Sequence, residues 1–383
     1  GSLQTGCIGY GTSFTQLQFS ILKRPVLYLI LLSLGVISGI CSCLVELPFE
    51  PTLKVNNLVV NGTISNLKTD QHILLSRTVG VSQPPIPLAG AQVRLVENGS
   101  KVYSFLEQSA GDYVLPGDEY DPTMLATYQI KIELSDGNQY QSDPDIMQVP
   151  VKPDSMTWTV GIHPVITSEG LIRNQDVVKV FANTSLPEGR KDLFLKWDLK
   201  SYFQFTTMPE CNPFKILSYC YYGGNSLQPE EIKIYSNLEA GVTRVQDLDM
   251  GFENIFPEYR FVETHYYELY QYRISELAYE YFRKLRLVSE QNGTIFDPIP
   301  ASVTSNVYNV NNPKEKVLGF FLVSSVEVIR KQLVAADFAG LYPLPDKVNN
   351  ICGWLKGIPE SVYFSACCDC KLPEKRIPKP VWW

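Results

Sequence analysis

The chain has 383 residues, a formal net charge of −7 and a hydrophobic content of 45%. This length accommodates about two domains of ordinary size, and the apolar content is sufficient for both to bury cores. The excess of acidic over basic residues, without any run of basic residues, disfavours binding to nucleic acid or to an anionic membrane surface.

The first predicted element is an uncharged segment that follows two cations. Lys23 and Arg24 precede residues 25–40, which carry no charge, and Cys41 and Cys43 come directly afterwards. A basic part, an apolar part and small residues, in this order, are typical of a secretory signal peptide. We therefore expect the remainder of the chain to leave the cytoplasm.

Cys43 is the predicted lipidation site, because the residues before it resemble a bacterial lipobox. Ser42 supplies the small residue that such a site needs, whereas Cys41 follows Ile40. Residues 1–42 are then an upstream segment and signal peptide, and 43–52 are the lipidated cysteine and a linker. The alternative is an uncleaved anchor, since residues 25–45 are uncharged and about twenty residues span a bilayer.

Residues 53–150 are predicted to form an immunoglobulin-like β-sandwich. Short apolar runs are separated by Gly, Asn and Asp turn residues, which is typical of such folds. The expected strands are 53–64, 72–77, 91–97, 102–106, 112–115 and 128–134. Asn61-Gly62 predicts a turn that breaks the first strand, and Asn98-Gly99 predicts a hairpin turn. Residues 90–116 also resemble carboxypeptidase regulatory-like modules.

Residues 151–383 are predicted to form a second β-rich domain with one main α-helix and a Cys-rich C-terminal tail. Two prolines near 147–157 interrupt the strand pattern and place the boundary. Further strands are expected at 156–165, 193–206, 260–274 and 317–329. The helix is expected at about 275–292, because Ser275 is a good N-cap and apolar residues follow at helical spacing. The fold class is therefore mainly β.

Six cysteines remain after Cys43, an even number that favours disulfides in an exported chain. The candidates are Cys211, Cys220, Cys352, Cys367, Cys368 and Cys370. Six cysteines allow fifteen pairings, so the connectivity stays open. Because the adjacent pair at 367 and 368 seldom bridges itself, Cys352 is expected to reach one of the last three cysteines.

The chain carries no motif that predicts catalysis, a metal or a cofactor. His72, His163 and His265 are far apart in sequence, and neither a Gly-x-Ser-x-Gly elbow nor a phosphate loop is present. Two acidic stretches, 118–121 and 247–251, supply too few oxygens for calcium and are interpreted as solvated turns. A catalytic site assembled from distant residues stays open, because such sites are recognised by geometry.

Tyrosines are concentrated in the second domain. A ligand or partner surface is predicted at Tyr266, Tyr267, Tyr270 and Tyr272, because tyrosine combines an apolar ring with a polar tip. Ordinary packing in half-buried strands is the alternative interpretation. Separately, Asp154-Ser155-Met156 resembles the O-glycosylation site of exported Bacteroidetes proteins, which makes Ser155 a candidate for modification.

Several segments in a fixed order resemble a known family. They are Cys43 with VELPFEP, GAQVRL and GDYVLP, LFLKWDLKSYFQF, ISELAYEYFRKL, IFDPIPASVTSNVYN, NPKEKVLGFF, CCDC and KPVWW. This order is similar to the Bacteroidetes outer-membrane lipoproteins of the domain-of-unknown-function family 4249 (DUF4249). The resemblance implies an accessory lipoprotein beside a TonB-dependent transporter, and it implies no catalytic residue and no ligand.

Three functional hypotheses follow. The first is a lipid-anchored outer-membrane protein, surface-exposed or facing the periplasm, that partners a TonB-dependent transporter in nutrient capture and is not an enzyme. The second is a cell-surface module that binds glycans through its tyrosines and serves in adhesion. The third is a hydrolase whose site joins His163 or His265 to a serine or to paired carboxylates.

Overall fold

The structure is a computed structural model, and it describes residues 56–79, 83–166, 169–189, 192–207, 218–229, 231–237, 243–256, 258–290, 303–345, 370 and 375–383. These residues are mainly β, as the sequence predicts, and they contain one α-helix. The strands form four sheets, and the buried apolar side chains gather in two large core clusters and one smaller one.

The first sandwich encloses the core that contains Leu58, Ile73, Leu95 and Tyr128. One of its sheets has the order β19-β1-β2-β7-β6 with β3 beside β2, and the other has the order β18-β9-β8-β4-β5 with β10 beside β8. The strands of the first sheet are β1 (Leu58–Ile64), β2 (Gln71–Arg77), β3 (Ile86–Pro87), β6 (Leu106–Ser109), β7 (Asp112–Leu115) and β19 (Leu318–Val323). Those of the second are β4 (Gln92–Glu97), β5 (Lys101–Ser104), β8 (Thr127–Glu133), β9 (Gln139–Ser142), β10 (Asp145–Ile146) and β18 (Val307–Asn309).

The second sandwich encloses the core that contains Val180, Trp197, Leu269 and Leu333. Its smaller sheet has the order β11-β12-β16, and its larger sheet has the order β20-β17-β13-β14-β21 with β15 beside β13. The strands are β11 (Ser155–Ile166), β12 (Ile172–Ser185), β13 (Phe194–Thr206), β14 (Tyr219–Ser226), β15 (Lys233–Ser236), β16 (Arg244–Asn254), β17 (Thr264–Ile274), β20 (Ser325–Val334) and β21 (Arg376–Ile377). Two short 3-10 helices, η2 (Glu258–Arg260) and η3 (Ala335–Phe338), complete it.

Strand β13 shows how the sequence pattern produces this architecture. Leu195, Trp197 and Leu199 are buried in the core, while Lys196 and Asp198 between them face outward. Period-2 alternation is what a sheet with one buried face requires. The predicted strand at 193–206 is therefore confirmed.

Helix α2 (Glu276–Ser289) begins as predicted, with the Ser275 hydroxyl accepting a hydrogen bond from the Ala278 backbone N–H. Ala278 is its buried residue, and it belongs to a small cluster with Phe194 of β13 and Phe320 of β19. The helix thus packs against strands of both sandwiches. It ends at Ser289, before the predicted limit at 292, which lies outside the described residues.

Asn61-Gly62 does not form the predicted turn. Strand β1 runs through both residues and pairs with β2 without a break. A Cβ atom at Gly62 would collide with the Cδ1 atom of Ile73, so glycine allows the neighbouring side chain to pack closely there, and a larger residue would force it to shift. The turn predicted at Asn98-Gly99 is confirmed, because both residues have positive φ angles between β4 and β5.

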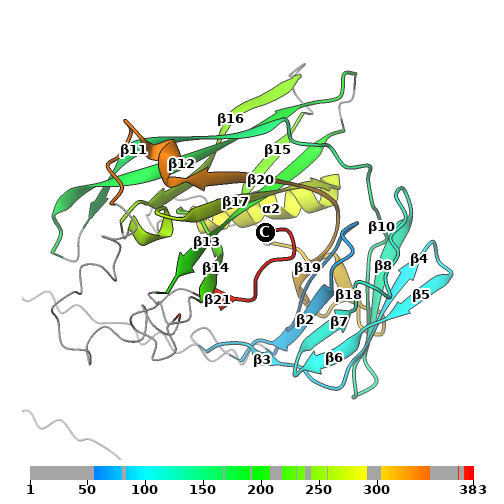
Figure 1. Ribbon diagram of the computed structural model, residues 1–383. Coiled ribbons are helices and arrows are strands. Elements are labelled where there is room, and N and C mark those ends of the chain that lie inside the picture. The colour runs from blue at the N-terminus through cyan, green and yellow to red at the C-terminus, as the bar shows by residue number, and fades with distance from the viewer. Residues whose placement is uncertain are drawn as a thin grey trace, which may run out of the picture. The chain divides into compact units, whose positions relative to one another are not determined.

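The strand predicted at 317–329 is not continuous. It is two strands, β19 and β20, separated at the buried Ser324. β19 pairs in parallel with β1 in the first sandwich, whereas β20 pairs with β17 in the second. The first sandwich therefore includes segments from beyond residue 300, which Figure 1 shows as yellow-orange strands among the blue and cyan ones. Such pairing depends on contacts that are distant in sequence, and local patterns do not reveal it.

Candidate functional site

The outer face of the larger sheet of the second sandwich carries tyrosines directly opposite charged side chains. In the register of β13 with β17, Lys196 lies opposite Tyr272, Asp198 opposite Tyr270, Lys200 opposite Glu268 and Tyr202 opposite Tyr266. Arg330 of β20 lies opposite Glu268 on the other side. We call this set the tyrosine face, and it consists of Lys196, Asp198, Lys200, Tyr202, Tyr266, Glu268, Tyr270, Tyr272 and Arg330.

Two lysines of the tyrosine face lie over tyrosine rings. The Nζ atom of Lys196 is 4.7 Å from the centroid of the Tyr272 ring, and that of Lys200 is 5.2 Å from the centroid of Tyr270. Lys196 also donates a hydrogen bond of 2.6 Å to Oδ2 of Asp198. Cation–π contacts of this kind stabilise by about 0.5–1 kcal/mol at exposed sites, so they hold the two rings in place.

Glu268 lies at the centre of the tyrosine face and is almost completely buried. Its carboxylate accepts a 2.6 Å hydrogen bond from the Tyr270 hydroxyl and a 2.8 Å bond from Nε of Arg330. Burial raises the pKa of Tyr270, and the hydrogen bond to the Glu268 carboxylate raises it further. Burial, followed by the charge of Glu268, raises the pKa of Tyr202 to about 12. Both hydroxyls therefore stay protonated at neutral pH and act as hydrogen-bond donors.

The C-terminal tail packs on one end of the tyrosine face. Its short strand β21 pairs with β14, and in Figure 1 the red tail continues from that strand. The Trp382 ring is 5.4 Å from the Tyr202 ring and 5.3 Å from the Tyr266 ring, measured between centroids. Arg330 lies over Trp382 at 4.5 Å. Trp383 contacts Tyr266 as well, at 4.7 Å. The tail thus covers this end and leaves Tyr270 and Tyr272 beyond it.

A disulfide between Cys220 of β14 and Cys370 holds the chain that leads into the tail. Its Cα atoms are 5.6 Å apart, which is a normal separation for a bridge. Two of the six candidate cysteines are therefore paired. The others, Cys211, Cys352, Cys367 and Cys368, lie outside the described residues, as does the predicted lipidation site Cys43.

A groove of about 390 Å³ opens beside the uncovered end of the tyrosine face. One wall contains Tyr270 and Tyr272. The facing residues come from the first sandwich, with Asn61 and Thr63 on β1 and His72 and Leu74 on β2. At this junction the side-chain amide of Asn66 donates a 3.2 Å hydrogen bond to the Val326 carbonyl and accepts one from the Val326 N–H, which ties the first sandwich to β20.

The polar wall of the groove carries side-chain donors and acceptors that the described residues leave unused. Within the described part of the chain, the side chains of Asn61 and Thr63 form no hydrogen bond, and both residues are exposed. His72 uses Nδ1 for a 3.0 Å contact with Asp112, which leaves Nε2 for another partner. Exposed groups of this kind can bind a polar ligand without breaking internal contacts.

The four tyrosines predicted as one surface do not lie together. Tyr266, Tyr270 and Tyr272 belong to the tyrosine face, whereas Tyr267 is completely buried in the core of the second sandwich. The prediction was wrong for Tyr267 because successive side chains of a strand point to opposite sides of the sheet. Sequence reasoning also missed Glu268, Arg330, Trp382 and the β1–β2 wall, since strand register brings them to the tyrosines and local sequence does not show it.

A family model described as "Domain of unknown function (DUF4249)" matches residues 45–330. The chain belongs to this family. Its matched region includes the groove walls and the whole tyrosine face, and it ends at Arg330, before the Cys370 tail. No curated protein matches the sequence.

The three histidines of this DUF4249 member lie in separate places. His72 borders the groove, and His163 packs against Phe252 with ring centroids 3.9 Å apart and the rings tilted by 30°. His265 is completely buried, with Nε2 3.3 Å from Glu253. Neither His163 nor His265 is hydrogen-bonded to a serine among the described residues.

The surroundings of His265 form a buried charged cluster. Its Nδ1 atom is 3.2 Å from the Arg260 carbonyl oxygen, and its ring stacks on Phe261 at 4.5 Å. Arg260 donates a 3.0 Å hydrogen bond to Glu253. Burial alone would raise the pKa of Glu253, but His265 and Arg260 outweigh this effect and lower it below its usual value. Glu253 is therefore ionised at neutral pH and holds two basic groups inside the sandwich.

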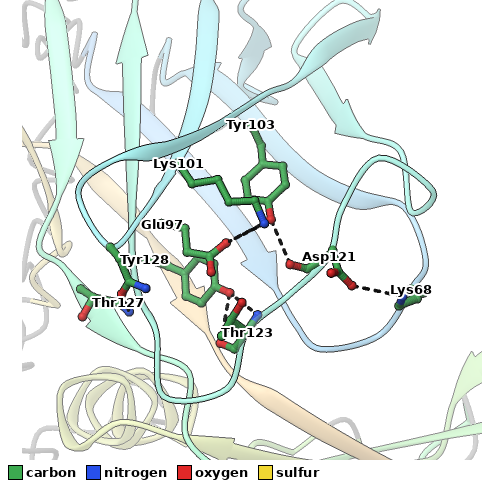
Figure 2. Close-up of polar contacts among 9 residues, drawn as sticks. Lys68, Glu97, Lys101, Tyr103, Asp121, Thr123, Thr127 and Tyr128 are labelled. Carbon is green, nitrogen blue, oxygen red and sulfur yellow. Dashed lines mark hydrogen bonds and ion pairs between the residues drawn. The ribbon is translucent and has the colours of Figure 1, made fainter.

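The acidic stretch at 247–251 is not a turn, because it lies inside strand β16 and pairs there with β12. The other acidic stretch, 118–121, is held by protein contacts. Figure 2 shows Tyr103 between Glu97 and Asp121, with its hydroxyl 3.0 Å from Oε2 of Glu97 and 2.9 Å from the Asp121 carbonyl oxygen. The Asp121 carboxylate pairs with Lys68 at 3.2 Å. Over the residues that are described, no group of three or more His, Cys, Asp or Glu side chains is placed to hold a metal ion.

Two further predictions have a defined place in the chain. Ser155 is the first residue of β11 and is partly exposed, and its modification stays a prediction. None of the helices in the described ranges is long and apolar enough to cross a membrane. The uncharged segment at 25–45 lies outside those ranges.

Proposed function

We propose that this protein is a non-catalytic binding protein, attached to the outer membrane by a lipid on Cys43, that works beside a TonB-dependent transporter in nutrient capture. The observation that carries the proposal is the tyrosine face with an open groove at its end, in a chain whose sequence predicts export. Aromatic rings fixed by charged neighbours, together with unused polar groups, are typical of a binding site.

The sequence supports the cellular place. An apolar segment followed by Cys43 is the pattern of a lipoprotein signal, and the family resemblance begins at this cysteine. The disulfide between Cys220 and Cys370 agrees with an oxidising compartment outside the cytoplasm.

The partnership is tested by purification of the tagged full-length chain from detergent-solubilised outer membranes. We expect a β-barrel transporter to co-purify with the protein in stoichiometric amounts. Cys41→Ala is the matched control for Cys43→Ala, because both remove a cysteine from the same segment. Incorporation of radiolabelled palmitate should be lost only in Cys43→Ala, and co-purification should fall with it because the anchor concentrates the protein at the membrane. If no transporter ever co-purifies with the lipidated protein, the partnership is wrong.

A further inference from the structure

We infer that the groove between the β1–β2 wall and Tyr270 and Tyr272 binds a neutral carbohydrate, with a sugar ring lying against the tyrosines. This inference rests on the proposed function, because it names the class of nutrient that the protein captures. It assigns the ligand to residues of both sandwiches, which the matched family description does not do.

The aromatic wall is already arranged as a platform. The rings of Tyr270 and Tyr272 are inclined by only 19° to each other, with centroids 6.4 Å apart. Lys196 and Lys200 approach these rings from β13. Strands β13 and β20 flank β17 on opposite sides. The lysines therefore cover the side of the two tyrosine rings toward β13, and the side toward β20 borders the groove.

The opposite wall complements the rim of a sugar. A pyranose ring has an apolar face of C–H groups and a rim of hydroxyls that both donate and accept hydrogen bonds. The side chains of Asn61 and Thr63 and the Nε2 atom of His72 offer donors and acceptors without a partner in the described residues. The half-exposed Leu74 adds a small apolar contact on the same wall.

The charges around the groove favour a neutral ligand. Lys196 is neutralised by Asp198, and the imidazole of His72 lies against Asp112. Asp70, on the groove lining, accepts a 3.0 Å hydrogen bond from the Gly117 N–H and keeps its negative charge, which disfavours an anionic ligand. A polyanion would also be repelled by a chain of net charge −7.

The volume of the groove limits the length of the ligand that it holds. About 390 Å³ lies near the lower end of the range for small-molecule sites, roughly 300–1,000 Å³. A short run of sugar units, with the chain of a longer polymer continuing into solvent, fits this space.

The test is calorimetric titration of the full-length protein in detergent with neutral hexasaccharides of glucose, xylose and mannose. A hexamer of galacturonate serves as the charged probe. We expect binding of at least one neutral hexamer and weaker binding of the uronate. Tyr272→Ala should weaken binding by about 2- to 12-fold, the range for loss of one aromatic contact, and Tyr272→Phe should retain it. Thr63→Val should also weaken binding, because it removes a hydroxyl and keeps the shape.

Tyr219→Ala is the matched control, since Tyr219 is an exposed tyrosine on β14 of the same sheet and does not line the groove. It should bind like the wild type, and melting temperatures verify that each variant is folded. The inference is overturned if no neutral sugar binds, or if Tyr272→Ala and Tyr219→Ala bind equally well. Absence of sugar binding with continued transporter co-purification rejects the carbohydrate and retains the proposed function. Tyrosine-dependent sugar binding without a transporter rejects the partnership and retains the groove.

Discussion

Replacement of Glu268 by Gln tests whether this carboxylate holds the tyrosine face together. The substitution keeps the size of the side chain and one acceptor oxygen for the Tyr270 hydroxyl, but it removes the negative charge that faces Arg330. An amide N–H₂ group cannot accept from the guanidinium. Arg330 would therefore lose its acceptor on residue 268, and it would no longer be held over Trp382.

The magnitude follows from the hydrogen bond that Arg330 donates from Nε at 2.8 Å and from the ion pair between its Nη2 atom and the same carboxylate oxygen at 2.6 Å. Hydrogen bonds to charged groups contribute about 1.5–3 kcal/mol each. The Arg330 side chain is 35% exposed, so water replaces some of this interaction when the charge is removed. We expect Glu268→Gln to lower the free energy of unfolding by about 2–4 kcal/mol.

The assay is urea unfolding of the full-length protein at pH 7, followed by near-ultraviolet circular dichroism. Trp158, Trp197, Trp382 and Trp383 belong to the second sandwich and its tail, so this signal reports mainly on that part of the chain. Limited trypsin digestion gives a second readout. The variant should be cleaved faster in the tail after Arg376.

Glu280→Gln is the matched control, because Glu280 pairs with Arg283 on the exposed face of helix α2. Surface pairs of this type contribute about 0.3–0.5 kcal/mol, so the control should unfold close to the wild type. Equal shifts of the urea midpoint in Glu268→Gln and Glu280→Gln would contradict this role of Glu268.

Three other changes test separate parts of the fold by the same urea assay. Cys220→Ala combined with Cys370→Ala should reduce the free energy of unfolding by about 5 kcal/mol at most, because the bridge joins residues 150 apart in sequence and limits the unfolded chain. Gly62→Ala should cost about 1–3 kcal/mol by overpacking, and Ile73→Val should relieve much of this cost because it deletes the Cδ1 atom that the new Cβ meets. Glu253→Gln should lower the free energy of unfolding most at pH 6, because a carboxylate with a lowered pKa stabilises the fold above its unfolded pKa of about 4.3. The difference in stability between the wild type and this variant should shrink as the pH falls to about 3.

Each of these predictions has a result that would contradict it. A reductant should destabilise the wild type and leave the cysteine double variant unchanged, and equal responses would count against the bridge. If Gly62→Ala and Ile73→Val have additive effects, the two side chains do not collide as inferred. A constant difference between wild type and Glu253→Gln from pH 3 to pH 6 would show that the carboxylate is not linked to stability in this range.

The alternation along β13, the N-cap at Ser275 and the hairpin turn at Asn98-Gly99 could be predicted from sequence. These features depend on neighbouring residues, whose periodicity and turn preferences act locally. The uncharged segment before Cys43 and the order of family-like stretches likewise required only the sequence, and the family assignment is confirmed. The mainly β fold class followed from the same local patterns.

The site itself was decided by the tertiary structure. Asn61-Gly62 lies inside a strand because β2 packs against it, and the break at Ser324 directs β19 to β1 and β20 to β17. These pairings bring the β1–β2 wall next to Tyr270, whereas Tyr267 is buried on the other side of the sheet. Local sequence shows which residues alternate. Long-range register then sets which strand each residue faces, because a shift of one position would turn every side chain to the opposite side of the sheet.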